Sequence, residues 1–145
     1  MAQTLPFDRT PTLTEVWEQA YAQSTPDDVF VRQYDGEAYS YKKIHAMAHC
    51  LAAYLVQRGQ RRGAPIVVIA SGHPVFVAVD LAINILGGVN IALPPDAGWR
   101  KIRYVIEAYG ASTVFVPSYA IFTRFKGWLN ELAPNAEMIC HADEH

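Results

Sequence analysis

The sequence is poor in cysteine and has no excess of charge of either sign. Cys50 and Cys140 are the only cysteines in 145 residues, and they form no Cys-x-x-Cys pair. Their scarcity argues against a disulfide framework and favours free thiols in a reducing cytosol. The formal net charge is −2, and the 12 Lys and Arg residues are mostly scattered. Because nucleic-acid binding requires a concentrated basic face, we expect no nucleic-acid partner. The cysteine usage predicts a cytoplasmic chain.

Long uninterrupted hydrophobic runs are also missing. The most apolar stretch, residues 66–93, is broken by Ser71-Gly72-His73-Pro74, by Asp80 and Asn84, and by Gly87-Gly88. A transmembrane helix needs about 17–25 continuous apolar residues. We therefore predict a buried core helix and no transmembrane segment.

Glycine is absent from the patterns that bind phosphate. The nine glycines form no Gly-x-Gly, no Walker loop and no Ser/Thr/Gly-rich run before a lysine. Such loops work because glycine lets backbone N–H groups converge on an anion. We therefore expect no catalytic, cofactor-binding or metal-binding residue in this segment, and no cofactor of its own.

What the sequence does contain is enough apolar material for one core, since 51% of its residues are hydrophobic. Residues 1–11, which include Pro6 and Pro11, are predicted to form an N-terminal arm, and residues 12–145 a single α/β domain. Helices and short apolar strands alternate from residue 40 onward. This alternation predicts a three-layer α/β domain with a mainly parallel sheet, plus an N-terminal helix and a β-hairpin.

The expected elements follow from apolar periodicity and from cap and turn residues. In chain order they are a helix capped by Thr12 or Thr14, a hairpin of Val29–Tyr34 and Glu37–Tyr41 around Asp35-Gly36, a long helix capped by Ser40 and ending at Gly59, strands at 66–70 and 89–93 around a helix at Pro74–Leu86, a helix at Trp99–Tyr109 ended by Gly110, a strand at Ser112–Val116, a helix at Ile121–Leu132 and a strand at Glu137–Cys140.

The segment Ser71-Gly72-His73-Pro74 is the best candidate for a ligand contact. It joins a predicted parallel strand to a helix, where α/β proteins bind ligands and helix N-termini favour anions. The alternative, which we favour, is an ordinary tight turn with Pro74 in the first helical turn.

Two histidine pairs have the i, i+4 spacing that invites a zinc interpretation. His45 and His49 share a helix face, but Ala46 stands where a general-base Glu would follow the first His, and no third ligand is evident. We favour partly exposed helix histidines. His141 and His145, at the end of the chain, suggest adventitious metal binding only.

Other polar and aromatic residues have both a structural and a functional interpretation. Asp80 and Asn84 form a polar stripe on an apolar helix and are expected to bond neighbouring backbone or a missing domain, because buried polar groups need partners. Ser118-Tyr119 has no base partner and no Gly-x-Ser-x-Gly context. The aromatic residues that suggest either an acyl pocket or, as we favour, core packing are Trp99, Tyr104, Phe122, Phe125 and Trp128.

Several segments together resemble the N-terminal region of AMP-forming acyl-CoA synthetases, of the adenylate-forming ligase superfamily. The resemblance covers about residues 12–140 and rests on order and spacing. Asp80 and the segment Leu129–Cys140 resemble long-chain fatty acid CoA ligases most. The matching segments are Asp35-Gly36 with Tyr39-Ser40-Tyr41, Leu51-Ala52-Ala53-Tyr54-Leu55 before Gly59, Val79-Asp80-Leu81-Ala82-Ile83, Leu86-Gly87-Gly88-Val89, Ile91-Ala92-Leu93-Pro94, Ile102-Arg103-Tyr104-Val105-Ile106 and Gly110-Ala111-Ser112.

The resemblance implies that this chain is the non-catalytic N-terminal subdomain of a longer enzyme. That enzyme would use ATP, magnesium and CoA to activate a fatty acid through an acyl-adenylate, and the partners of this segment would be the remainder of the enzyme and a second copy in a homodimer. Four departures from the family pattern, at Gly63-Ala64, Gly72, Val75 and Lys43, suggest an alternative. This alternative is a stand-alone interaction or scaffold domain derived from such an enzyme, without catalysis.

Overall fold

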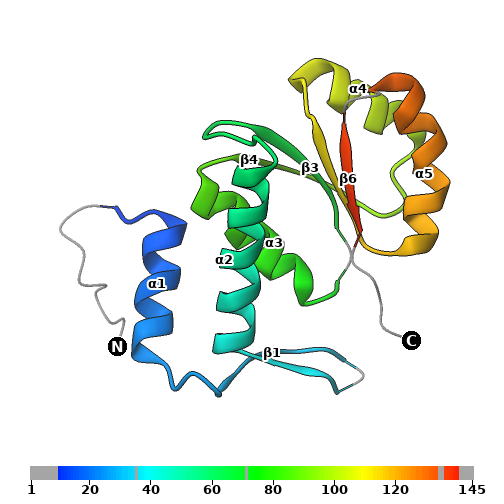
Figure 1. The fold of residues 1–145 in the computed structure, drawn as a ribbon. Helices are drawn as coiled ribbons and strands as arrows, with labels where there is room; N and C mark the ends of the chain where they lie inside the picture. The colour runs from blue at the N-terminus through cyan, green and yellow to red at the C-terminus, as the bar shows by residue number, and fades with distance from the viewer. Residues whose placement is uncertain (1–9, 35, 71, 134–135, 141–145) are drawn as a thin grey trace.

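The computed structural model describes residues 10–34, 36–70, 72–133 and 136–140, so most of the predicted N-terminal arm lies outside the described residues. Helices and strands alternate along most of the chain, as the sequence predicts (Figure 1). In chain order the elements are α1 (Leu13–Gln23), β1 (Val29–Arg32), β2 (Ala38–Ser40), α2 (Tyr41–Gln57), β3 (Pro65–Ile69), α3 (Val75–Leu86), β4 (Val89–Leu93), α4 (Trp99–Tyr109), β5 (Thr113–Val116), α5 (Tyr119–Leu132) and β6 (Glu137–Cys140).

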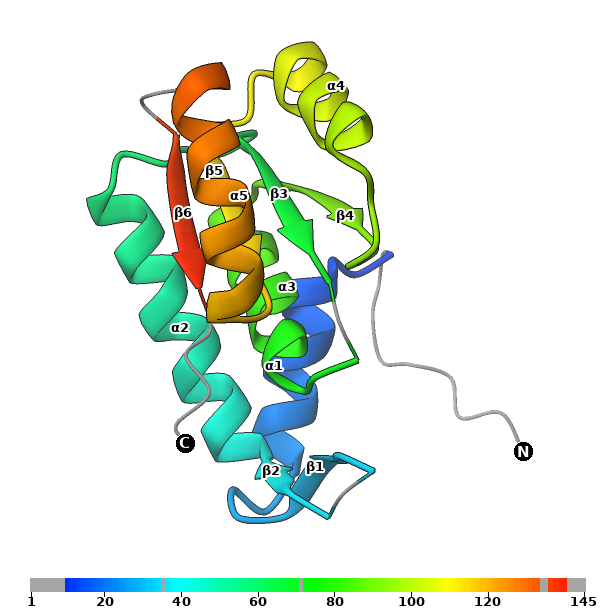
Figure 2. The ribbon, with the colours of Figure 1, turned by 90° about the vertical axis from the view of Figure 1, so that its right-hand side faces the viewer.

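Four strands form a parallel sheet in the order β4-β3-β5-β6. Helices α2 and α3 lie on one face of this sheet, and α4 and α5 lie on the other (Figures 1 and 2). Strands β1 and β2 form a separate antiparallel hairpin. The predicted three-layer α/β fold, with its N-terminal helix and hairpin, is confirmed.

The central strand β3 contributes to both layers of the core. Alternate side chains of a strand point to opposite faces of the sheet. Ile66 and Val68 therefore pack with α2 and α3, whereas Val67 and Ile69 pack with α4 and α5. A strand buried on both faces has no polar alternation, which explains the continuous run of β-branched residues from 66 to 69.

Local sequence signals place the helix ends where they were expected. Thr12 caps α1 through a capping box in which its hydroxyl accepts from the Glu15 N–H and Glu15 bonds back to the Thr12 N–H. Ser40 caps α2 by accepting from the Lys43 N–H. Gly110 ends α4 in the left-handed conformation, with φ of 65°, which glycine adopts without steric cost.

The hairpin and α1 are joined to α2 and α3 by a separate apolar cluster. Trp17 of α1 is 5% exposed and packs with Tyr39 of β2, Ile44 of α2 and Leu81 of α3. At the opposite end of α2, Glu137 of β6 accepts from the Tyr54 hydroxyl and pairs with Arg58 at 3.0 Å. Helix α2 therefore connects the N-terminal hairpin to the edge strand β6.

Candidate functional site

The turn between β3 and α3 lies at the C-terminal end of the parallel sheet, as the sequence predicts for residues 71–74. Ser71 lies outside the described residues, and Gly72 is exposed. The imidazole Nδ1 of His73 accepts a hydrogen bond from the Val75 N–H at 3.2 Å, and its ring meets Tyr39 edge to face at 5.8 Å. His73 thus satisfies one of the free N–H groups at the start of α3. This contact supports the interpretation of residues 72–74 as a structural turn.

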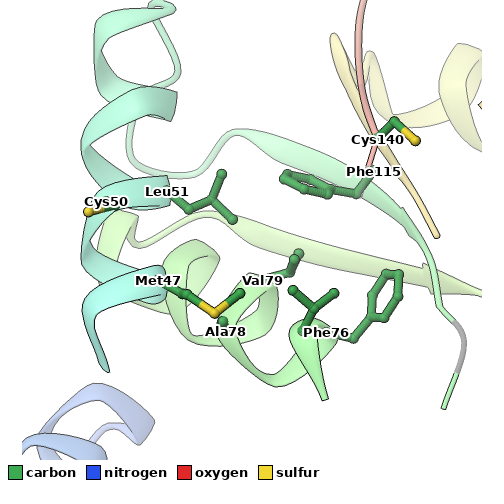
Figure 3. A pocket seen from close by; sticks show the side chains of 9 residues that line it. Met47, Cys50, Leu51, Phe76, Ala78, Val79, Phe115 and Cys140 are labelled. Carbon is green, nitrogen blue, oxygen red and sulfur yellow. The ribbon is translucent and has the colours of Figure 1, made fainter. Parts of the chain in front are cut away.

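An apolar cavity of about 390 Å³ lies between α2, α3 and the β5–β6 part of the sheet (Figure 3). Cys50 and Cys140, which form no disulfide, come from opposite sides of it. None of the described residues that line the cavity carries a charged side chain, so the cavity can accept apolar groups. The lining residues are Met47, Cys50, Leu51, Val75, Phe76, Ala78, Val79, Phe115 and Cys140.

The polar stripe of α3 is used to hold the edge strand β4. The Asn84 amide donates to the Asp80 backbone carbonyl at 2.8 Å. The Asp80 carboxylate accepts from the Asn90 amide at 2.7 Å, which ties α3 to β4. The predicted bond to neighbouring backbone is confirmed for Asn84, whereas Asp80 bonds the side chain of Asn90, a partner that the sequence did not indicate.

The aromatic residues of α4 and α5 pack mainly against one another rather than around the cavity. Trp99 and Trp128 lie 5.0 Å apart between ring centroids, and Phe125 meets Trp128 at 5.5 Å. Phe125 is buried in the core, Trp99, Phe122 and Trp128 are partly buried, and Tyr104 is 67% exposed. The core interpretation therefore fits four of these five residues.

Ser118 has a structural role at the start of α5. Its hydroxyl accepts a hydrogen bond from the Ile121 N–H at 3.4 Å, and it is the N-cap residue of the helix. The neighbouring Tyr119 is exposed and stacks on Phe122. Neither residue contacts a general base among the described side chains.

The two α2 histidines meet a carboxylate that the sequence analysis did not place beside them. Glu18 of α1 lies 3.0 Å from His49 Nε2 and 4.0 Å from His45 Nδ1. Burial and the neighbouring His49 charge hold the pKa of His45 below its ordinary value, while the Glu18 charge opposes this shift. Glu18 is 27 and 31 residues away from the histidines and on another helix, so no local pattern indicates this proximity. His141 and His145 lie outside the described residues.

The described helices also bear on the membrane question. None of them combines the length and the apolar character needed to cross a bilayer.

Comparisons with known proteins identify the family. A family model described as AMP-binding enzyme matches residues 17–144. The medium-chain fatty-acid–CoA ligase of Escherichia coli (strain K12) is 27% identical over 113 residues, which are 78% of this chain and 20% of that protein. The 4-coumarate-CoA ligase 2 of Narcissus pseudonarcissus is 27% identical over 96 residues, which are 66% of this chain and 17% of that protein.

A solved structure shares the fold. The structure of an anthranilate CoA ligase in complex with anthranoyl-AMP superimposes with a TM-score of 0.79 at 11% identity, over 90% of this chain and 25% of that one. This chain spans about a fifth of the length of these two ligases. Since the family model covers nearly all of the chain and the parallel α/β fold agrees with it, the chain belongs to the AMP-binding enzyme family, within the adenylate-forming ligase superfamily.

Proposed function

We propose that this chain is the N-terminal part of an ATP-dependent acid–CoA ligase and supplies scaffold rather than reacting groups. In the proposed reaction a carboxylate attacks the α-phosphorus of ATP, pyrophosphate leaves, and an acyl-adenylate forms. The CoA thiol then attacks the acyl carbon and releases AMP. The complete enzyme would use magnesium with ATP. The family match over residues 17–144 is the observation that carries this proposal.

The described side chains are consistent with a scaffolding role. The polar groups at the C-terminal ends of the strands serve the fold, since His73 bonds the start of α3 and Ser118 caps α5. The cavity between α2, α3 and the sheet has an apolar lining. ATP phosphates require convergent N–H donors and positive charge, and no described residue of the cavity lining carries a positive charge. The nucleotide and the reacting groups would therefore be held by the remainder of the enzyme.

We propose a long-chain fatty acid as the carboxylate substrate. Support comes from the resemblance of Asp80 and Leu129–Cys140 to long-chain ligases, and from the similarity to a ligase of medium-chain fatty acids. The proposed partners of this segment are the remainder of the enzyme and a second copy in a homodimer. A proposed cytoplasmic location accords with two cysteines that form no disulfide.

The transcript and the complete translated product together test this proposal. We expect the reading frame to continue beyond residue 145 and to encode a Ser/Thr/Gly-rich loop ending in a lysine. The product should then catalyse carboxylate-dependent exchange of pyrophosphate into ATP, most strongly with long-chain fatty acids. A variant with that loop lysine replaced by alanine is the negative control. The proposal would be contradicted if none of the carboxylates tested supported pyrophosphate exchange by the complete product. Stronger exchange with medium-chain acids than with long-chain acids would contradict only the long-chain assignment.

The alternative is a stand-alone interaction or scaffold domain without catalysis, and the contacts of Lys43 favour it. Lys43, which replaces a Glu often found in the family, pairs with Glu37 at 3.6 Å and lies 3.9 Å from the centroid of the Tyr39 ring. Lys43, which departs from the family pattern, therefore has local partners in this fold. A stop codon directly after residue 145 in the natural transcript would favour this alternative.

A further inference from the structure

The strongest unassigned cluster of potential metal ligands joins α1 to α2. It consists of Glu18 from α1 and of His45 and His49 from α2, and it is called the Glu18 cluster below. One potential ligand atom from each of the three side chains lies within 4.8 Å of the other two. The Glu18 carboxylate lies 3.0 Å from His49 Nε2 and 4.0 Å from His45 Nδ1. The cluster shares no residue with the apolar cavity.

The donor set indicates which class of cation it suits. Two imidazoles spaced i, i+4 project from the same side of a helix, and a carboxylate from a second helix completes three donors. Imidazole nitrogen favours zinc, copper and nickel, whereas magnesium and calcium prefer oxygen donors. With metal–ligand distances of about 2.0–2.2 Å, two ligands of a tetrahedral zinc ion lie about 3.3–3.5 Å apart. The distances from the Glu18 carboxylate to His49 Nε2 and His45 Nδ1, 3.0 and 4.0 Å, lie on either side of this range.

We propose that Glu18, His45 and His49 bind a late first-row transition-metal cation such as Zn²⁺ and thereby clamp α1 onto α2. The side chains of these residues are 42%, 22% and 45% exposed, respectively, so water can complete the coordination. This inference does not depend on the proposed ligase function.

Two neighbours of His45 determine how the metal would bind. The Tyr21 ring stacks on the His45 imidazole at 3.8 Å and limits its rotation. The Trp17 indole Nε1–H donates to His45 Nδ1 at 3.2 Å, the nitrogen nearest to Glu18. A nitrogen lone pair cannot serve a proton donor and a metal together, so binding at Nδ1 releases the Trp17 indole. The indole N–H of Trp17 is therefore a reporter inside the site.

The test is a calorimetric titration of the chelator-treated full chain with Zn²⁺. His141→Gln and His145→Gln are introduced first, because that pair has the same spacing and would bind metal on its own. We expect one ion per chain in the micromolar range or tighter. Glu18→Gln and His49→Gln, which keep polar side chains at exposed positions, should each weaken binding at least about tenfold. Glu131→Gln, an exposed glutamate of α5, is the matched control and should leave binding unchanged.

Several results would overturn the site. The first is that the parent with the His141 and His145 substitutions binds no Zn²⁺. The second is that Zn²⁺ binding is unchanged in both Glu18→Gln and His49→Gln. The third is that only His49→Gln weakens binding, which would mean a histidine pair that binds metal without the carboxylate. Circular dichroism of each variant separates loss of a ligand from loss of the fold.

A second measurement locates the ion within the chain. In ¹H–¹⁵N spectra, Zn²⁺ should move the Trp17 indole N–H signal and leave those of Trp99 and Trp128 in place, because the latter two lie between α4 and α5. Trp17→Phe assigns the signal. An unmoved Trp17 signal at saturating Zn²⁺ would exclude coordination at His45 Nδ1 and overturn the proposed geometry.

Discussion

Replacing Ile83 by alanine tests whether α3 occupies the centre of the fold. The Ile83 side chain is fully buried and packs in a cluster with Leu55 of α2, Ile66 of β3 and Phe115 of β5. The substitution removes three carbons, worth about 2.4 kcal/mol at about 0.8 kcal/mol per buried carbon. Because neighbours from three elements hold the space open, a residual cavity adds to this loss. We expect a total destabilisation of about 3–4 kcal/mol, within the range of about 2–5 for such truncations.

Urea unfolding followed by circular dichroism measures this loss. With a slope of about 2 kcal/mol per molar urea, the Ile83→Ala midpoint should fall by about 1.5–2 M. Lys101→Ala, at an exposed position of α4, is the control and should change stability by less than about 0.5 kcal/mol. Equal and small effects from the two substitutions would refute the central position of α3. The interpretation of β3, α3 and β4 as a buried strand–helix–strand unit, on which the family resemblance depends, would then be wrong.

Three further predictions concern local features of the chain. Gly127 lies inside α5, and a Cβ added there would meet open space, so Gly127→Ala should stabilise the chain by about 0.5–1 kcal/mol in the same urea assay. Gly110→Ala, at φ of +65°, should instead destabilise it by about 1 kcal/mol. Changes in unfolding free energy of the same sign for both substitutions would contradict this reasoning. Asp80→Ala removes the acceptor of Asn90 and should cost about 1–3 kcal/mol, and a neutral result in thermal unfolding would mean that water replaces this contact. Burial and the His49 charge hold the pKa of His45 below its ordinary value, so the unfolded state takes up the proton first as pH falls. The stability due to neutral His45 is therefore present above about pH 6.5 and is lost below it. In metal-free protein His45→Gln should flatten the decline of unfolding free energy between about pH 7 and 5, and an unchanged slope would contradict this assignment.

The elements that local chemistry specifies could be predicted from the sequence. The Thr12 and Ser40 caps and the Gly110 stop involve hydrogen bonds or dihedral angles within a few residues, and each appears where expected. Strand β1 ends at Arg32, two residues before its predicted end. The reason is that the Gln33 N–H bonds to the Glu37 carbonyl and closes the hairpin turn. Such turn geometry is not visible in residue types alone.

Features that depend on contacts between distant residues could not be predicted. The order β4-β3-β5-β6 is a choice among parallel arrangements that share the same apolar pattern. The cavity was missed because its lining residues, such as Phe76 and Phe115, have the periodicity of ordinary core. Glu18 was missed for the same reason of distance, since nothing near it in the chain indicates two histidines on another helix.

The central claim is that this chain supplies scaffold and that the nucleotide site lies elsewhere. Calorimetric titration of the purified chain with Mg-ATP tests this claim most directly, because no other part of an enzyme is present. We predict no saturable binding tighter than a dissociation constant of about 100 μM, which corresponds to about −5.5 kcal/mol. One-to-one binding tighter than that value would contradict the claim and would place a nucleotide site within these 145 residues.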